Sequence, residues 1–232
     1  MKNAHYSAMQ AGLSLAPLSL SMFAVALIAG KRSGRPSSVI RLGFAVLTIG
    51  MVLLIPIVPR ADSGWYLAIP LVIAGSGLGM LVSQLNNYTL APISEERVSE
   101  AAGVNSAGGS FGLSFGLAFA GAIMLAALAF TFTAEAEAST VLSPAEQQRV
   151  SQALEDDAEV MSNTKLEELL VGQPQDVQEE IIRINTEARP LALQVALLIP
   201  ILAGLAGLLV SFRMKRQPDP TPSGSTEGMT LG

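Results

Sequence analysis

Hydrophobic residues along this chain are gathered into long stretches that contain no charged side chain. There are five, and they run over Tyr6 to Gly30, Leu42 to Pro59, Trp65 to Ile93, Ala101 to Ala134 and Leu191 to Phe212. About 20 helical residues cover the roughly 30 Å of hydrocarbon in a bilayer. A soluble domain with five buried helices is the alternative, but such helices normally keep a polar stripe, whereas these stretches are apolar nearly all round. The pattern predicts an all-α integral membrane protein.

The same pattern predicts the division of the chain. We expect transmembrane helices over Tyr6–Gly30, Val39–Val58, Trp65–Leu85, Ala101–Phe132 and Leu191–Phe212. Residues 1–132 then form a four-span segment, residues 133–190 an acidic helical loop, and residues 191–212 the last span. Residues 213–232 are rich in Pro, Gly, Ser and Thr, and we expect them to be a disordered tail.

Basic residues cluster at two places that fix the expected orientation. Four follow the first span and three follow the fifth, namely Lys31, Arg32, Arg35, Arg41, Arg213, Lys215 and Arg216. Cytoplasmic loops carry an excess of Lys and Arg, so both clusters should be cytoplasmic. Alternating from there places the C-terminus in the cytoplasm of a multi-pass plasma (cell inner) membrane protein. The N-terminus and the 133–190 loop then lie outside the cell.

The 133–190 loop is acidic and its pattern is helical. It holds thirteen Asp or Glu against four Lys or Arg. Ser143 and Glu146 form a capping box around Pro144, which predicts a helix from Pro144 towards Val160. A second amphipathic helix should lead to Pro190, because apolar residues recur at helical spacing at Val177, Ile181, Ile184 and Ala188. Between them residues 165–170 should form a short turn of helix, which Gly172 and Pro174 break. The acidic surface is either a solvated face or a means of recruiting cations.

Small residues recur every fourth position in two of the spans. They are Gly75 and Gly79 in the third, and Gly108, Gly112 and Gly116 in the fourth. Small residues at this spacing let membrane helices approach closely. We expect these glycines to pack spans three and four closely. Packing alone explains them, although smooth surfaces also suit helices that slide in a rocking transporter.

Polar uncharged side chains at membrane depth form the candidate substrate pathway: Gln84, Asn86, Asn105, Ser110 and Ser114. An amide in hydrocarbon is costly unless it is paired or faces water, so we expect these residues to face a bundle interior or a cavity. Hydrogen bonding between helices and contact with a substrate both remain open as their role.

Composition narrows the classes of function. The 232 residues are 50% hydrophobic and 14% charged, with a net charge of −5 and no cysteine. Disulfides, thiolate catalysis and sulfur-ligated metals are therefore excluded, and nothing is basic enough to attract nucleic acid. No charged residue lies centrally in a span, and we find neither a phosphate-binding loop nor a catalytic constellation. We expect no enzyme activity, no metal and no cofactor.

Several short motifs occur in an order that resembles a known family. Gln10-Ala11-Gly12-Leu13 opens the first span, and Pro17 follows it. A basic turn then runs from Gly30 through Lys31, Arg32 and Gly34 to Arg35, and later come GSGLGMLVSQLNNYTLAPISEERVSEAAGVNSAGGSFGLSFG and a Leu-Ser-Pro-Ala-Glu helix start. This order is similar to the later half of major facilitator superfamily transporters, in the fourteen-span drug:proton antiporter subfamily.

The resemblance covers Met9 to about Phe212 and implies the last five of fourteen spans. The chain is then a fragment of a longer transporter or a truncated relative that needs a partner subunit, because five spans cannot form two six-helix bundles. Some relatives have an acid in the span matching Asn105–Phe130, where this chain has Asn105 and serines.

Two classes of function follow. One is part of a proton-coupled exporter of small amphiphilic molecules. The other is a non-transporting membrane protein whose acidic external loop binds a partner.

Overall fold

The computed structural model describes residues 8–31, 36–61, 63–148, 166–168 and 170–216. In these residues no strand occurs, and the main elements are α1 (Ala8–Lys31), α2 (Pro36–Ile57), α3 (Ala68–Leu90), α4 (Val98–Ala138) and α7 (Gln175–Ser211). Short 3-10 helices cover Val58–Arg60, Gly64–Leu67, Glu95–Arg97 and Phe212–Arg216. Each of the five α-helices is long and apolar enough to cross a membrane, which confirms the prediction of five such segments.

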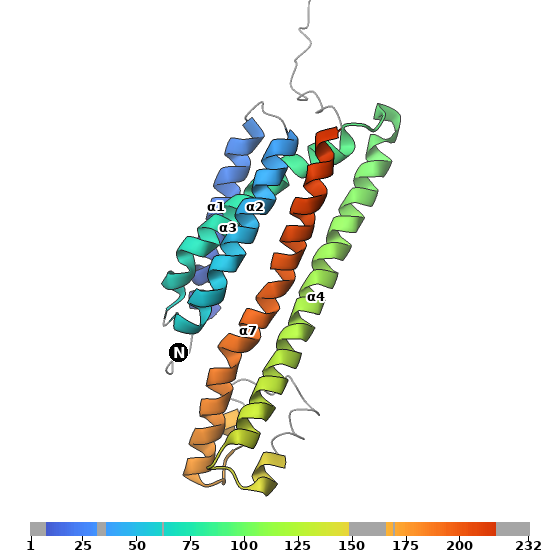
Figure 1. The fold of residues 1–232 in the computed structure, drawn as a ribbon. Helices are drawn as coiled ribbons and strands as arrows, with labels where there is room; N and C mark the ends of the chain where they lie inside the picture. The colour runs from blue at the N-terminus through green and yellow to red at the C-terminus, as the bar shows by residue number, and fades with distance from the viewer. Residues whose placement is uncertain (1–7, 32–35, 62, 149–165, 169, 217–232) are drawn as a thin grey trace, which may run out of the picture.

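Helices that follow one another along the chain run in opposite directions (Figure 1). In the row formed by their contacts, the neighbours α1 and α3 run in the same direction. Helix α3 packs against both α1 and α2, α2 also packs against α7, and α7 packs against α4. The end of α7 therefore lies beside the start of α2, where the Arg41 guanidinium carbon is 4.7 Å from the centre of the Phe212 ring. The Tyr88 hydroxyl also donates to the Met214 carbonyl at 3.2 Å. Arg41 of the first basic cluster and Arg213 of the second thus share one end of the molecule.

Glycines allow α3 to lie almost in backbone contact with α1. A Cβ atom at Gly79 would stand 2.5 Å from the carbonyl oxygen of Met22, and one at Gly75 would overlap the carbonyl group of Leu18. Gln84 adds a hydrogen bond across this interface, since its Nε2 donates to the carbonyl of Ala29 at 3.0 Å. The close approach expected of Gly75 and Gly79 is present, but their partner is α1.

A second glycine contact joins α3 to α2. A Cβ at Gly77 would lie 2.7 Å from the carbonyl oxygen of Gly43, and one at Gly50 would lie 2.5 Å from the backbone nitrogen of Ala74. Helix α3 is therefore fixed on two sides. A Cβ at any of the predicted packing glycines of α4 would meet nothing within 4 Å, so close packing of that span stays a prediction.

Small residues and an amide also join α7 to α2. A Cβ at Gly204 would overlap the side chain of Thr48, and one at Gly207 would overlap the ring of Phe44. Nearer the other end of this interface, Gln194 Nε2 donates to the carbonyl oxygen of Ile55 at 2.6 Å. The Gln194 side chain therefore forms a hydrogen bond between α7 and α2.

Helices α4 and α7 continue beyond the apolar segments and pack on each other as an antiparallel stalk (Figure 1). Their buried core contains Leu128, Phe132, Ala136, Leu142, Leu166, Leu170, Val177, Ile181, Ile184, Ala188 and Ala192. The amphipathic pattern predicted for the second helix of the loop is confirmed, since its four apolar positions are all buried.

Both stalk helices differ in extent from their predicted bounds. Pro190 lies inside α7 and does not divide it into two helices. A proline removes one backbone donor, but buried Ala188 and Ala192 on either side hold the helix against α4. Helix α4 likewise runs past Phe132 to Ala138, because Phe132 and Ala136 both pack into the stalk core.

The end of the stalk carries the predicted capping pair. The Glu146 carboxylate accepts hydrogen bonds from the backbone N–H of Ser143 at 2.7 Å and from its hydroxyl at 2.5 Å. Residues 144–148 are helical, and the predicted continuation towards Val160 lies outside the described residues. Residues 166–168 form the expected short helical turn, and Gly172 follows with a φ of +93°, a conformation that favours glycine.

A polar network ties the two stalk helices together at this end. Ser139, at the C-terminal cap of α4, donates its hydroxyl hydrogen to Glu180 of α7 at 2.7 Å. Arg183 donates to the same carboxylate at 2.9 Å and to Glu187 at 2.6 Å. The hydrogen bonds from Arg183 and Ser139 lower the pKa of Glu180 from 4.5 to about 2. The hydrogen bond to Glu180 raises the pKa of Arg183.

We predict that Glu180→Gln loosens the stalk in a pH-dependent way. Because the pKa of Glu180 is depressed in the folded stalk, its contribution is fully present above pH 4.5 and disappears as the pH falls towards 2. Hydrogen exchange of the α7 amides near Glu180 should be slower in the wild type than in the variant at pH 7. Comparing both proteins at the same pH cancels the intrinsic pH dependence of the amide exchange rate. An equal difference between wild type and variant at pH 7 and at pH 2 would contradict the role given to the Glu180 carboxylate.

The glycine contacts predict a matched pair of variants. Gly77→Leu places a side chain where the backbone of α2 lies, and should destabilise the purified chain by about 1–3 kcal/mol. Gly108→Leu is the control, since nothing lies within 4 Å of a Cβ at that position. Thermal unfolding in detergent measures both, and equal loss of stability would show that the α2–α3 contact is not the cause.

Candidate functional site

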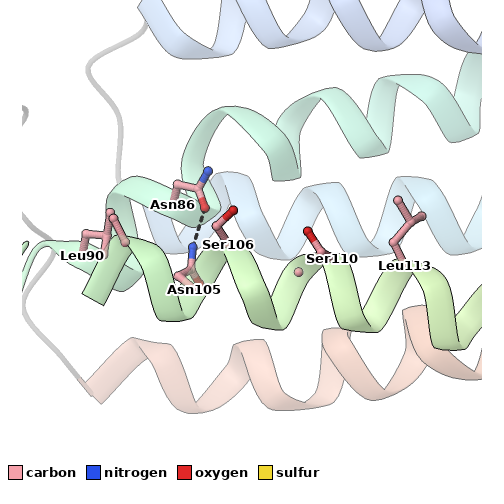
Figure 2. A pocket seen from close by; sticks show the side chains of 8 residues that line it. Asn86, Leu90, Asn105, Ser106, Ser110 and Leu113 are labelled. Atoms are coloured by element: carbon pink, nitrogen blue, oxygen red, sulfur yellow. Dashed lines mark hydrogen bonds between the residues drawn. The ribbon is translucent and has the colours of Figure 1, made fainter. Parts of the chain in front are cut away.

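An open groove lies between the end of α3 and the first turns of α4 (Figure 2). It has a volume of about 420 Å³ and is lined by Asn86, Leu90, Ala102, Asn105, Ser106, Gly109, Ser110 and Leu113. Small-molecule sites occupy roughly 300–1,000 Å³, so the space is of the right order for a ligand. Most of its wall is one face of α4, because the α4 positions recur at spacings of three and four residues.

Two asparagine side chains meet across the groove. Asn105 Nδ2 on α4 donates to Asn86 Oδ1 on α3 at 2.7 Å, as Figure 2 shows. The connection between the helices is short, with a 3-10 turn at Glu95–Arg97, so α3 and α4 are close at this end. The amide bridge is a direct side-chain link between them.

Beyond the groove, the apolar part of α4 is almost uncovered. No residue of α4 before Leu128 is buried, and Phe111 and Leu117 are 70% and 75% exposed. Phe111, Phe115 and Phe119 stack along one side with ring centres 5.8 Å apart. Large apolar side chains exposed in this number need lipid or further protein around them.

The structure separates the five predicted pathway residues into three groups. Asn86, Asn105 and Ser110 line the groove. Gln84 is buried elsewhere, where its hydrogen bond to α1 makes it a link between helices. Ser114 is exposed on α4 and does not line the groove.

None of the other predicted site residues that the structure describes lines the groove. A Cβ at Gly108, Gly112 or Gly116 would meet nothing within 4 Å, so their role in packing stays a prediction. In the basic turn, Gly30 and Lys31 are the last residues of α1, whereas Arg32, Gly34 and Arg35 lie outside the described residues.

The sequence prediction of the pathway did not include Leu90, Ala102, Ser106, Gly109 and Leu113. The four on α4 could have been found by extending the helical spacing from Asn105 and Ser110. Leu90 could not, because its position depends on how α3 meets α4.

The groove offers hydrogen bonds but no charge. All eight lining residues are uncharged. A neighbouring hollow of about 600 Å³ shares Leu90 and Asn105 and includes Arg97 and Glu100, which form an exposed ion pair at 3.4 Å. Within the described part of the chain, no group of His, Cys, Asp or Glu could hold a metal ion. The polar groups that the groove presents are therefore amides and hydroxyls.

Comparisons with known proteins add no assignment, since no family model, curated protein or solved structure matches this chain.

The amide bridge predicts a local effect of Asn105→Ala. The variant removes a link worth about 1 kcal/mol while leaving the rest of the fold intact, so the first turns of α4 should exchange backbone hydrogens several-fold faster. Ser114→Ala, an exposed position two turns along the same helix, should leave exchange there unchanged. Equal exchange in the wild type and Asn105→Ala would mean that the bridge does not hold α4.

Proposed function

We propose that this chain is part of a secondary active transporter, a proton-coupled exporter of small amphiphilic molecules in the plasma membrane. The observation that carries the proposal is the Asn86–Asn105 pair in an open groove on an otherwise uncovered apolar helix. Amide groups at membrane depth are stable only against a partner or water. A groove of this kind suits the wall of a pathway through a larger helical bundle.

The packing of the other helices supports the same proposal. Helices α1, α2, α3 and α7 are joined through glycines and interhelical amides, whereas α4 is held mainly at its ends. An uncovered α4 is the expected condition of a helix whose neighbours belong to further spans of a bundle. We propose that additional spans or a partner subunit cover it, and that these spans supply the acidic residue needed for proton coupling.

The orientation in this proposal follows from the basic clusters. Arg41 and Arg213 lie at one end of the helices and the acidic stalk at the other. We place the basic end and the C-terminus in the cytoplasm, so that the groove opens near the cytoplasmic side and the 133–190 loop is extracytoplasmic.

The stalk favours a second candidate function. Its buried core and the polar network at its end make it a folded unit, with Glu135, Glu137, Glu167, Glu168, Asp176 and Glu179 around it. A non-transporting membrane protein could use such a unit to bind an external partner. In that case the groove residues would not affect any transport.

The test uses the complete reading frame that contains this chain, expressed in cells that lack other exporters. Asn105→Ala should keep normal protein levels and change resistance to exported compounds by about fivefold, since it removes a hydrogen bond worth about 1 kcal/mol. Gly112→Leu should instead reduce assembly, because a leucine blocks close approach of a covering helix.

Ser114→Ala serves as the control for transport, and we expect it to export like the wild type. If Asn105→Ala and Gly112→Leu both show normal protein levels and normal resistance, the exporter assignment is wrong and the partner-binding function is favoured.

A further inference from the structure

The two asparagines that meet in the groove leave part of their hydrogen-bonding capacity unused. An amide side chain has one acceptor oxygen and two N–H donors. The single bond between the residues uses the Asn105 nitrogen and the Asn86 oxygen. Among the described residues, neither the Asn86 nitrogen nor the Asn105 oxygen has another protein partner. The groove therefore presents one amide donor group and one amide acceptor, one from each helix, that no described residue engages.

One free donor group and one free acceptor remain whichever way the oxygen and nitrogen atoms of the two side-chain amides are assigned. Exchanging the oxygen and nitrogen of both side chains reverses the direction of the bond between them. The pair still keeps one amide nitrogen and one amide oxygen free. A ligand with both a donor and an acceptor could satisfy both, whereas an ester or ether, which has no donor, could satisfy only one.

The surroundings of the pair favour a ligand without charge. The lining residues are neutral, and Arg97 and Glu100 of the neighbouring hollow pair with each other. An ion that left water for this groove would lose hydration without gaining a counter-ion. An uncharged amide loses much less, because the pair replaces its hydrogen bonds to water.

The far end of the groove is suited to an apolar body. Gly109 has no side chain, so the groove reaches the backbone of α4 there, and Leu113 follows on the same face (Figure 2). Ser106 and Ser110 stand along the groove between the amide pair and Leu113. The polar and apolar parts of the groove thus follow each other along one helix face.

We propose that the groove selects uncharged amphiphiles whose polar end is an amide, with the N–H donating to the free asparagine oxygen and the carbonyl accepting from the free asparagine nitrogen. The proposal rests on the proposed function for its role in export. The binding step itself needs no transport and is measured separately.

The experiment compares three twelve-carbon probes on the purified chain in lipid nanodiscs. Scintillation proximity with tritiated dodecanamide measures saturable binding, and unlabelled methyl dodecanoate and dodecyltrimethylammonium serve as competitors. Dodecanamide should bind about fivefold more tightly than the ester, which lacks the donor, and at least about tenfold more tightly than the cation. Because the three probes are compared on the wild type, this result does not depend on a variant folding.

The double variant Asn86→Leu/Asn105→Leu, which keeps the size of both side chains and removes both amides, should weaken dodecanamide binding about five- to tenfold and leave the ester and the amide nearly equal. Ser114→Ala is the matched control and should bind like the wild type. Thermal unfolding of both variants checks that each retains the fold.

Equal binding of the amide and the ester by the wild type, or tighter binding of the cation, overturns the proposal. Unchanged selectivity for the amide in the folded double variant overturns it as well. Amide-selective binding with no export of any amide in cells would instead leave this inference standing and remove the proposed exporter. Export that persists without amide-selective binding would overturn this inference and leave the proposed exporter standing.

Discussion

Hydrocarbon cannot hydrogen-bond to a polypeptide, and five helices long and apolar enough to cross a membrane must meet this constraint where they pack on one another. Where water does not drive apolar surfaces together, helices associate through close packing and hydrogen bonds between them. Glycines bring α3 against α1 and α2, and Gln84 and Gln194 then reach carbonyl groups of neighbouring helices. The same short distances that permit packing thus satisfy the amides.

Helix α4 is the exception, and its exposure follows from where its contacts lie. Its C-terminal third packs on α7 in the stalk, and its first turns reach α3 through Asn105. Between these two points no buried residue holds it. The helix that carries the candidate groove is therefore held by the rest of the described chain mainly at its two ends.

The sequence predicted the helices well because each depends on local composition. Charge-free stretches located all five segments, and the apolar spacing of Val177 and Ile181 identified the face that α7 buries in the stalk. Helix partners depend on three-dimensional contacts, so the glycine pattern predicted close packing at Gly75 and Gly79 but not their contact with α1. The same limit applies to the site: Asn86 and Asn105 were chosen as amides in spans, but their mutual hydrogen bond, and the separation of Gln84 from them, required the fold. Proline locally favours the end of a helix, yet α7 continues through Pro190 because the residues before and after it are packed against α4.

The account requires that the groove and the stalk face opposite sides of one membrane, and single-cysteine labelling measures this directly. The chain has no cysteine of its own, so Ser94→Cys beside the groove and Thr140→Cys at the end of the stalk each report one position. A membrane-impermeant maleimide should label position 140 in intact cells and position 94 only after the cells are permeabilised. Labelling of both positions in intact cells, or of neither, would contradict the arrangement.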